Sequence, residues 1–276
     1  MTRGLLIPLA ILVLPIAVLF SCSSGGGIGG TGATGVTVGP ITKFGSIFVN
    51  DAELDISNAT VDLRGAPGNP GDPNLGLKLG MLVMVRGEFS PDGLTGVAHS
   101  VQYEDNLEGP VDSVDVAGSR ITVLGQTVSV NAATVLEGVS AFGDLLQGNM
   151  VEVSGLFDAS GNIVATRIEF KAQDFSGIGE LDIKGTISSL NPGAMTFAIG
   201  NLQVDYSSVE AEHFPSGGLS VGLFVAIKSN QAPSGGTVVA SEVERNRPTP
   251  DAELTQAGSR SSDGLSPLMD AIPDGV

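Results

Sequence analysis

The sequence predicts an all-β protein in which three small β-barrels follow one another behind an N-terminal leader. Two observations carry this prediction. The 276 residues include 39 Gly, 15 Pro and no Trp, and 42% are hydrophobic, so the core must be built from Val, Ile, Leu and Phe, which favours strands. Apolar residues at alternate positions, the periodicity of a strand, form a pattern that recurs three times along the chain.

Residues 1–21 are interpreted as a bacterial secretion signal. Arg3 precedes an uncharged apolar run from Leu5 to Phe20, which is the arrangement of a signal peptide. The run is shorter than the roughly 20 residues of a membrane-spanning helix, and Pro8 and Pro15 interrupt it. A permanent anchor helix is therefore the weaker interpretation.

The leader ends in LFSC, residues 19–22, which resembles the lipobox of bacterial lipoproteins, although Phe20 departs from the small or branched residue usual there. In those proteins the Cys thiol takes a diacylglyceryl group and becomes the new N-terminus. Cys22 is the only Cys of the chain, so a secreted thiol here has no disulfide partner. We therefore predict lipidation at Cys22 and a membrane anchor formed by its acyl chains. The alternative is an ordinary signal peptide followed by an incidental Cys.

Ser23, rather than Asp, follows this Cys, as in enterobacterial lipoproteins that are sorted to the outer membrane. We expect a lipoprotein of the bacterial cell envelope, in the outer membrane, that faces the periplasm or the cell surface. Residues 22–35 are then the lipidated Cys and a Gly-rich tether. Within them GIGGTG, residues 27–32, matches a dinucleotide-binding pattern, but that fingerprint needs a strand before it and a helix after it. We predict a flexible tether and no cofactor.

Each repeat contains a predicted β-hairpin. The hairpins begin at Gly45, Ser119 and Ala194 and read GSIFVNDAELDIS, SRITVLGQTVSVN and AMTFAIGNLQVDYS. Both arms alternate apolar and polar residues, and a break between them predicts a tight turn. The predicted turns are Asn50-Asp51, Leu124-Gly125 and Gly200-Asn201.

A second pair of strands follows in each repeat. Its first arm aligns on Gly80, Gly148 and Gly222, and its second arm aligns on Ala98, Ala165 and Ala240. An opening strand precedes each hairpin, which gives about five short strands per repeat. The predicted repeats span residues 36–105 (repeat 1), 106–173 (repeat 2) and 178–246 (repeat 3), and the Pro-, Asp- and Ser-rich tail 247–276 is predicted to be disordered.

Closed barrels are preferred to one long open sheet. Each repeat is close to the lower size limit for a self-sufficient core, and closure removes the exposed strand edges that a Val-rich sheet would present for aggregation. A two-sheet sandwich is the alternative, because the strand count does not fix connectivity. Repeat 1 also carries an extra Pro- and Gly-rich loop, residues 64–76, which is either a binding loop or a neutral insertion.

One short motif suggests catalysis. GLSVG, residues 218–222, places Ser220 in the Gly-x-Ser-x-Gly pattern of the hydrolase nucleophile elbow. That elbow needs a helix after the Ser, together with a His and an acid brought close by the fold. A strand is predicted after Ser220, and neither His99 nor His213 falls at a recurring position. We predict no catalytic residue and no enzymatic activity, and we keep a serine hydrolase that uses Ser220 as the alternative.

The charge balance argues against nucleic acid and metal ions as ligands. Removal of the leader takes away Arg3, one of 13 Lys and Arg, and leaves all 30 Asp and Glu, so the surface repels phosphate backbones. The Asp residues lack the spacing of a calcium loop, so we predict a solvated acidic face and no metal site. Glu152 and Arg167 fall on the outward arms of one hairpin, which predicts a surface ion pair worth at most about 1 kcal/mol.

Several motifs together resemble bacterial proteins built from domain of unknown function 5666. They are VGPITKFGSIFVN, EGPVDSVD, ITVLGQTVSV, VEVSG and VATRIEF, within residues 35–245. The resemblance implies tandem barrels like the oligonucleotide/oligosaccharide-binding (OB) fold, commonly on exported lipoproteins, and no established enzymatic activity. The hypothesis is therefore a non-catalytic envelope lipoprotein whose tandem β-domains bind or scaffold another envelope component, a protein or a glycan. A glycan-binding module is weakened by the lack of Trp and by only two Tyr, Tyr103 and Tyr206.

Overall fold

The structure, a computed structural model, describes residues 33–64, 66–210 and 216–246. The predicted signal peptide 1–21, Cys22 and the predicted disordered tail 247–276 lie outside the described residues. All described residues belong to one compact unit, Gly32–Val276. Among them there is no helix with the length and apolar character needed to cross a membrane.

Repeat 1 is a closed five-stranded barrel with a two-stranded extension. Its strands are β1 (Ala33–Phe44), β2 (Ile47–Val49), β3 (Ala52–Asp55), β4 (Thr60–Leu63), β5 (Ala66–Pro67), β6 (Leu82–Phe89) and β7 (Thr95–Tyr103). β1 pairs with β2 and β6, β7 pairs with β6, and a parallel pairing of β3 with β7 closes the ring. β4 pairs with the rest of β7, and β5 pairs with β4. β1 begins at Ala33, within the range predicted as tether.

Repeat 2 closes in the same way. Its strands are β8 (Leu107–Asp115), β9 (Arg120–Val123), β10 (Gln126–Ser129), β11 (Val135–Glu137), β12 (Met150–Phe157) and β13 (Ile163–Ala172). The ring runs β8–β9–β10–β13–β12 and returns to β8, again with one parallel pairing, β10 with β13. Two single turns of 3₁₀ helix, Phe142–Asp144 and Phe175–Gly177, are the helical segments of the described chain.

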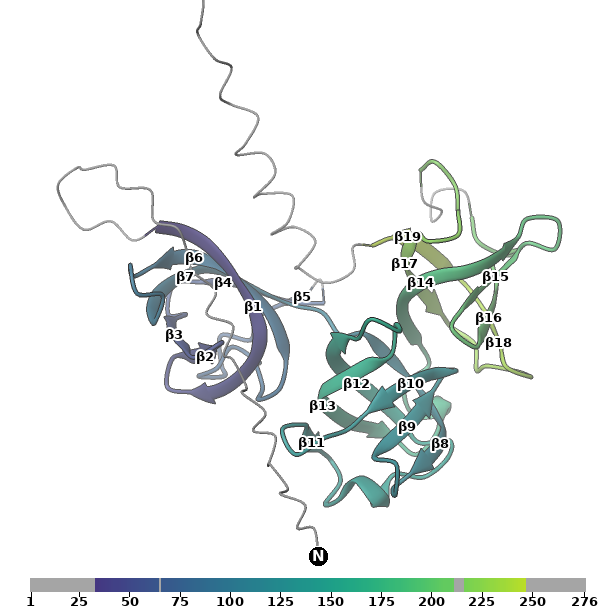
Figure 1. The fold of residues 1–276 in the computed structure, drawn as a ribbon, viewed down its shortest axis with the longest axis horizontal. Coiled ribbons are helices and arrows are strands. Elements are labelled where there is room, and N and C mark those ends of the chain that lie inside the picture. Colours follow the sequence, from purple (N-terminus) through teal and green to yellow (C-terminus); the bar gives the residue numbers. More distant parts are fainter. Residues whose placement is uncertain (1–32, 65, 211–215, 247–276) are drawn as a thin grey trace, which may run out of the picture. The chain divides into compact units, whose positions relative to one another are not determined.

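Repeat 3 has a last strand that is broken in two. Its strands are β14 (Leu181–Asn191), β15 (Thr196–Ile199), β16 (Leu202–Asp205), β17 (Phe224–Ser229), β18 (Thr237–Val239) and β19 (Glu242–Arg245). β18 pairs parallel to β16, β19 pairs with β17, and β17 pairs with β14. The two pieces together fill the place of β7 and β13, so the protein consists of three small closed β-barrels (Figure 1). This confirms the all-β, three-barrel prediction.

The hairpin turns lie where the sequence predicts them. Asn50 and Asp51 have φ of 51° and 65°, and Leu124 and Gly125 have φ of 47° and 69°. Two successive positive φ values match the twist of the flanking strands, as in a type I′ turn. Leu124 accepts this conformation because its side chain is buried against Gly109, where an added Cβ would overlap it. This contact explains why Gly109 stands in the EGPVDSVD segment of repeat 2.

The buried side chains form two cores. One core lies within repeat 1, and the other runs continuously through repeats 2 and 3. The two later barrels also share backbone pairing, since Glu108 and Leu107 of β8 lie opposite Asp182 and Ile183 of β14. Repeat 1 is joined to them differently, by a linker of residues 104–106 and by polar contacts.

Candidate functional site

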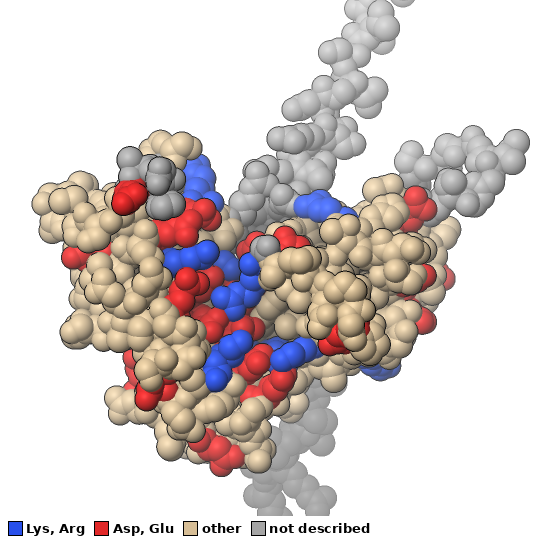
Figure 2. All heavy atoms as spheres, turned by 180° about the vertical axis from the view of Figure 1, so that it is seen from behind, with Lys and Arg blue, Asp and Glu red and all other residues tan. Residues whose placement is uncertain are grey.

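Charged side chains from all three repeats meet in one network, which we call the charged junction. Figure 2 shows Lys and Arg interleaved with Asp and Glu across the middle of one face. Within the described residues, the network consists of seven carboxylates, Glu104, Asp105, Glu108, Glu137, Glu152, Glu169 and Asp182, and five cations, Arg64, Lys78, Arg167, Lys171 and Lys184. The whole chain has only 13 Lys and Arg. More than a third of its cations therefore gather in this network.

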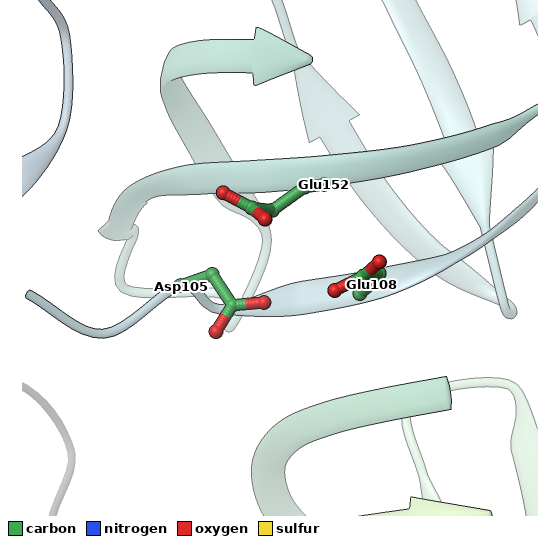
Figure 3. Close-up of side chains that lie close together, drawn as sticks. All are labelled: Asp105, Glu108 and Glu152. Atoms are coloured by element: carbon green, nitrogen blue, oxygen red, sulfur yellow. The ribbon is translucent and has the colours of Figure 1, made fainter. Parts of the chain in front are cut away.

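Strand register aligns the central carboxylates. Glu108 of β8 lies directly opposite Glu152 of β12 on one side and opposite Asp182 of β14 on the other. Directly opposed residues of neighbouring strands point to the same face of the sheet, and like charges in such positions repel one another. Figure 3 shows Glu108 and Glu152 on these adjacent strands, with Asp105 where the chain enters β8. The sheet therefore requires cations on this face.

Arg64 supplies the main positive charge. Its Nη1 lies 2.6 Å from Glu108 Oε2 and 3.0 Å from Glu152 Oε2. Its Nε lies 3.3 Å from Asp105 Oδ1, and its Nη2 lies 3.9 Å from Asp182 Oδ2. Burial alone would lower the pKa of Arg64, but the charge of Asp105 and the hydrogen bond to Glu108 outweigh it and raise that pKa. One guanidinium of repeat 1 thus joins carboxylates of repeats 2 and 3.

Glu152 is held ionised by three donors. Tyr103 donates its hydroxyl hydrogen to Glu152 Oε1 at 2.6 Å, and Lys171 Nζ lies 3.1 Å from Glu152 Oε2. Burial would raise the pKa of Glu152, but the Tyr103 hydrogen bond and the charges of Lys171 and Arg64 lower it below its usual value. Tyr103 is buried as well, and its own pKa is raised by that burial and by the nearby carboxylates.

The linker between repeats 1 and 2 contacts both later barrels. Asn106 N–H donates to Val153 O at 2.9 Å, and Asn106 Oδ1 accepts from Gly155 N–H at 2.6 Å, both in β12. Asn106 O accepts from Lys184 N–H of β14 at 3.0 Å, and Lys184 Nζ donates to Asp105 O at 2.8 Å. The backbone at residues 105–106 is therefore bonded to repeat 2 and repeat 3 together.

A second part of the charged junction joins repeat 1 to the outer face of β13. Lys78 Nζ lies 2.8 Å from Glu137, and Arg167, whose side chain is 2% exposed, forms ion pairs with Glu137 and, at 2.7 Å, with Glu169. Lys171 connects the two parts, since its Nζ lies 3.9 Å from Glu169 and also contacts Glu152.

The two barrels approach closely at this point. Gly80, with φ of 78°, lies so near β13 that an added Cβ would be 2.5 Å from Thr166 O. Arg167 Nη1 donates to Leu79 O at 3.4 Å, and Leu82 N–H donates to Ser154 Oγ at 2.9 Å. Repeat 1 and repeat 2 are therefore in direct backbone-level contact.

The predicted surface pair of Glu152 and Arg167 is wrong. Both side chains are buried, and each pairs with other residues, Glu152 with Arg64 and Lys171, and Arg167 with Glu137 and Glu169. The alternation of the hairpin correctly placed them on its outward face. That face is covered by repeat 1, which periodicity within one repeat cannot reveal.

Sequence reasoning missed most of the charged junction. The sequence marks Arg64 only as the first residue of the extra loop in repeat 1, and no motif distinguishes Asp105, Glu108 or Asp182. A usable signal was the presence of Glu108, Glu152 and Asp182 within otherwise largely apolar strand segments, where an acid is costly unless a cation lies nearby.

The three carboxylates of Figure 3 are the one described group with the spacing of a metal site, since oxygens of Asp105, Glu108 and Glu152 lie within 4.8 Å of one another. The protein's own cations take that space: Arg64 contacts all three carboxylates, and Lys171 contacts Glu152. A divalent ion would have to displace both side chains, so these residues do not fit a metal. The absence of a metal site stays a prediction.

The residues considered for catalysis lie apart from the charged junction. Ser220 is exposed and lies in the loop before β17, and it is therefore followed by a strand and not by the helix of a nucleophile elbow. Within the described residues, no hydrogen bond of its hydroxyl is found. His99 is exposed on β7, with its Nε2 4.0 Å from Glu88, and His213 lies outside the described residues. The lack of enzymatic activity stays a prediction.

Each of the three repeats matches the same protein-family model. A family model described as domain of unknown function, DUF5666, matches residues 38–102, 108–169 and 184–244, which is more than half of the chain. The chain belongs to the DUF5666 family. The three matches confirm the threefold repeat, and the charged junction joins all three DUF5666 copies.

Other comparisons add little to this DUF5666 protein. Among solved structures it is similar to drosophila Unr CSD456, with 12% identity and a TM-score of 0.22 over 78% of this chain and 99% of that one. The barrel fold of the chain is defined by its own strand pairing. No curated protein matches the chain.

Proposed function

We propose that this protein is a non-catalytic lipoprotein of the bacterial cell envelope and that its three DUF5666 barrels scaffold or bind another envelope component. The observation that carries the proposal is the charged junction, which joins side chains and backbone of all three repeats. Its carboxylates are engaged by the protein's own cations, so they are not presented to a substrate.

The energetics of such a network favour a positioning role. Buried ion pairs often contribute little net stability, because desolvation offsets the Coulomb attraction, but breaking one is costly. Their directional contacts select one arrangement of the groups that form them. Barrels held in one arrangement present their outer surfaces at fixed spacing, which a scaffold for a multi-point partner requires.

The anchor is supported by sequence alone, through Cys22. Ten residues separate Cys22 from Ala33, the first residue of β1. An extended chain spans at most about 3.6 Å per residue, so repeat 1 would lie within about 40 Å of the membrane surface. Palmitate labelling of the wild type that disappears in Cys22→Ala supports the anchor, whereas an unlabelled wild type contradicts it.

A protein partner is favoured over a glycan. Sugar rings usually stack on exposed aromatic side chains, yet Tyr103 is 2% exposed and Tyr206 packs beside Phe197, with 5.8 Å between the ring centroids. Repeat 3 has an open groove of about 310 Å³, and none of its described lining residues is aromatic.

The acidic surface argues further against a nucleic acid, because five cations are already engaged in the charged junction.

In-cell crosslinking of the tagged protein, followed by mass spectrometry, tests the scaffold directly. We expect one envelope protein to be recovered reproducibly and to be lost in Cys22→Ala, the unanchored control. Recovery of bulk envelope material alone contradicts a protein scaffold. A fluorophosphonate probe tests the non-catalytic part of the proposal, and labelling that is lost in Ser220→Ala overturns it.

A further inference from the structure

The central part of the charged junction holds more negative than positive charge. Three cations, Arg64, Lys171 and Lys184, form ion pairs with four carboxylates, Asp105, Glu108, Glu152 and Asp182. Lys228 lies opposite Asp182 and also favours its ionised form, but the ion pair of Lys228 is with Glu242. The carboxylate side chains are 0 to 12% exposed. Among the cations, Lys184 is 11% exposed, whereas Arg64 and Lys171 are 27% and 29% exposed. The excess charge thus belongs to the most buried groups, where an ionised carboxylate is least favourable.

Asp105 is the least compensated of the four. Within the described part of the chain, neither of its carboxylate oxygens has a hydrogen bond, and Asp182 Oδ1 also lacks one. The nearest charges to Asp105 Oδ1 are Arg64 Nε at 3.3 Å and Lys184 Nζ at 3.6 Å, beyond the usual hydrogen-bond length. The side chain is itself fully buried.

The charged and titratable groups near Asp105 come from all three repeats. These groups are Arg64 after β4, Tyr103 at the end of β7, Glu104 in the linker, Glu108 on β8, Glu152 on β12, and Asp182 and Lys184 on β14. Arg64 and Lys184 favour the ionised carboxylate, whereas burial and the charges of Asp182 and Glu152 favour the protonated one. The residue also lies in the linker that bonds to β12 and β14, so its charge state acts on all three repeats.

We propose that Asp105 is a proton-controlled latch of the charged junction: a proton taken from solvent onto its carboxylate removes the excess charge and tightens the contact between the repeats. Loss of that proton loosens the contact. The proposal concerns the junction alone and holds wherever the chain resides.

The direction of the effect follows from the titration of the buried acids. Burial raises the pKa of Asp105 from 3.8 to about 6, and it also raises the pKa of Asp182 and Glu108. A carboxyl group with a raised pKa stabilises the folded junction at acid pH, and this contribution is lost as the pH rises through about 6. Glu152 has a lowered pKa and acts in the opposite direction, below its usual 4.5. The charged junction is therefore tighter between about pH 4.5 and pH 6 than at neutral pH.

Amide hydrogen exchange measures this tightening at the bonds that cross the junction. The reporters are the amides of Leu82, Asn106 and Lys184, with protection factors corrected for the pH dependence of intrinsic exchange. A pKa of 3.8 when the junction is open and about 6 when it is closed predicts about tenfold greater protection at pH 5 than at pH 7.

Two variants separate the latch from general acid effects. Asp105→Asn, a neutral group of the same shape, should lose most of the difference in protection between pH 5 and pH 7, and what remains is the contribution of Asp182 and Glu108. The control is Asp115→Asn, an exposed Asp that pairs with Arg120 at 2.9 Å and should keep the tenfold difference. Equal protection of the wild type at both pH values, or a tenfold difference retained in Asp105→Asn, overturns the proposal. If Asp105→Asn does not fold, the wild-type comparison decides alone.

Discussion

Replacing Arg64 by Gln should destabilise the protein more than loss of any exposed cation. The guanidinium contacts Glu108 and Glu152, whose side chains are only 8% and 6% exposed, so its removal leaves buried carboxylates uncompensated. Breaking a buried ion pair on one side costs about 3–5 kcal/mol. Lys171 still contacts Glu152 at 3.1 Å, which places the expected cost near the lower end, about 3 kcal/mol, or about a hundredfold in the unfolding equilibrium.

Urea unfolding of the wild type and of Arg64→Gln measures this cost. The matched control is Arg120→Gln, which removes an Arg from an exposed pair with Asp115, with side chains 60% and 43% exposed. Exposed pairs are worth about 1 kcal/mol or less, so this variant should unfold close to the wild type. A loss in Arg64→Gln no larger than that in Arg120→Gln would refute the reasoning.

Three further predictions concern Glu152, Gly109 and Gly80. Burial would raise the pKa of Glu152, but the Tyr103 hydrogen bond and the charges of Lys171 and Arg64 lower it. The contribution of Glu152 to stability is therefore present above pH 4.5 and lost as the pH falls. The loss of stability on acidification should be smaller in Glu152→Gln than in the wild type, and as in the wild type in Glu53→Gln, the control at an exposed site. Gly109→Ala should cost about 1–3 kcal/mol in thermal or urea unfolding, because the new methyl group overlaps Leu124, whereas Gly193→Ala, with its nearest neighbour 3.6 Å away, should be close to neutral. Gly80 and Gly222 occupy aligned positions with φ of 78° and 87°, but of the two only Gly80 contacts repeat 2. Gly80→Ala should therefore lose more stability in urea unfolding than Gly222→Ala. An equal loss in both variants would show that the contact with repeat 2 contributes nothing.

The fold was predictable because the strands of each repeat are visible in the sequence of that repeat. Alternating apolar residues marked both arms of the hairpins, and the turns at Asn50-Asp51 and Leu124-Gly125 lie where the alternation breaks. Closure followed from the aggregation hazard of open edges. The break between β18 and β19 was not predicted, since the aligned Ala240 there is as buried as its counterparts.

The charged junction was not predictable from the same pattern. Alternation places Glu152 and Arg167 on the outward face of a hairpin, and outward normally means solvent. Whether another barrel covers that face depends on contacts between Arg64 and residues 44 to 88 positions away, which a single sequence does not reveal. The charge count gave a weak indication of this covered face, because the chain has few cations among many acids and several of the cations fall at outward strand positions.

The distance between repeats 1 and 2 tests the central claim most directly, namely that the charged junction holds the barrels in one arrangement. Nitroxide labels at Leu94→Cys and Val116→Cys, whose native side chains are 56% and 58% exposed, report this distance by pulsed electron paramagnetic resonance in a chain with Cys22→Ser. We predict one narrow distance distribution, broadened by Arg64→Gln and left narrow by Arg120→Gln. A broad distribution in the chain that retains Arg64, or no change in Arg64→Gln, would contradict the account.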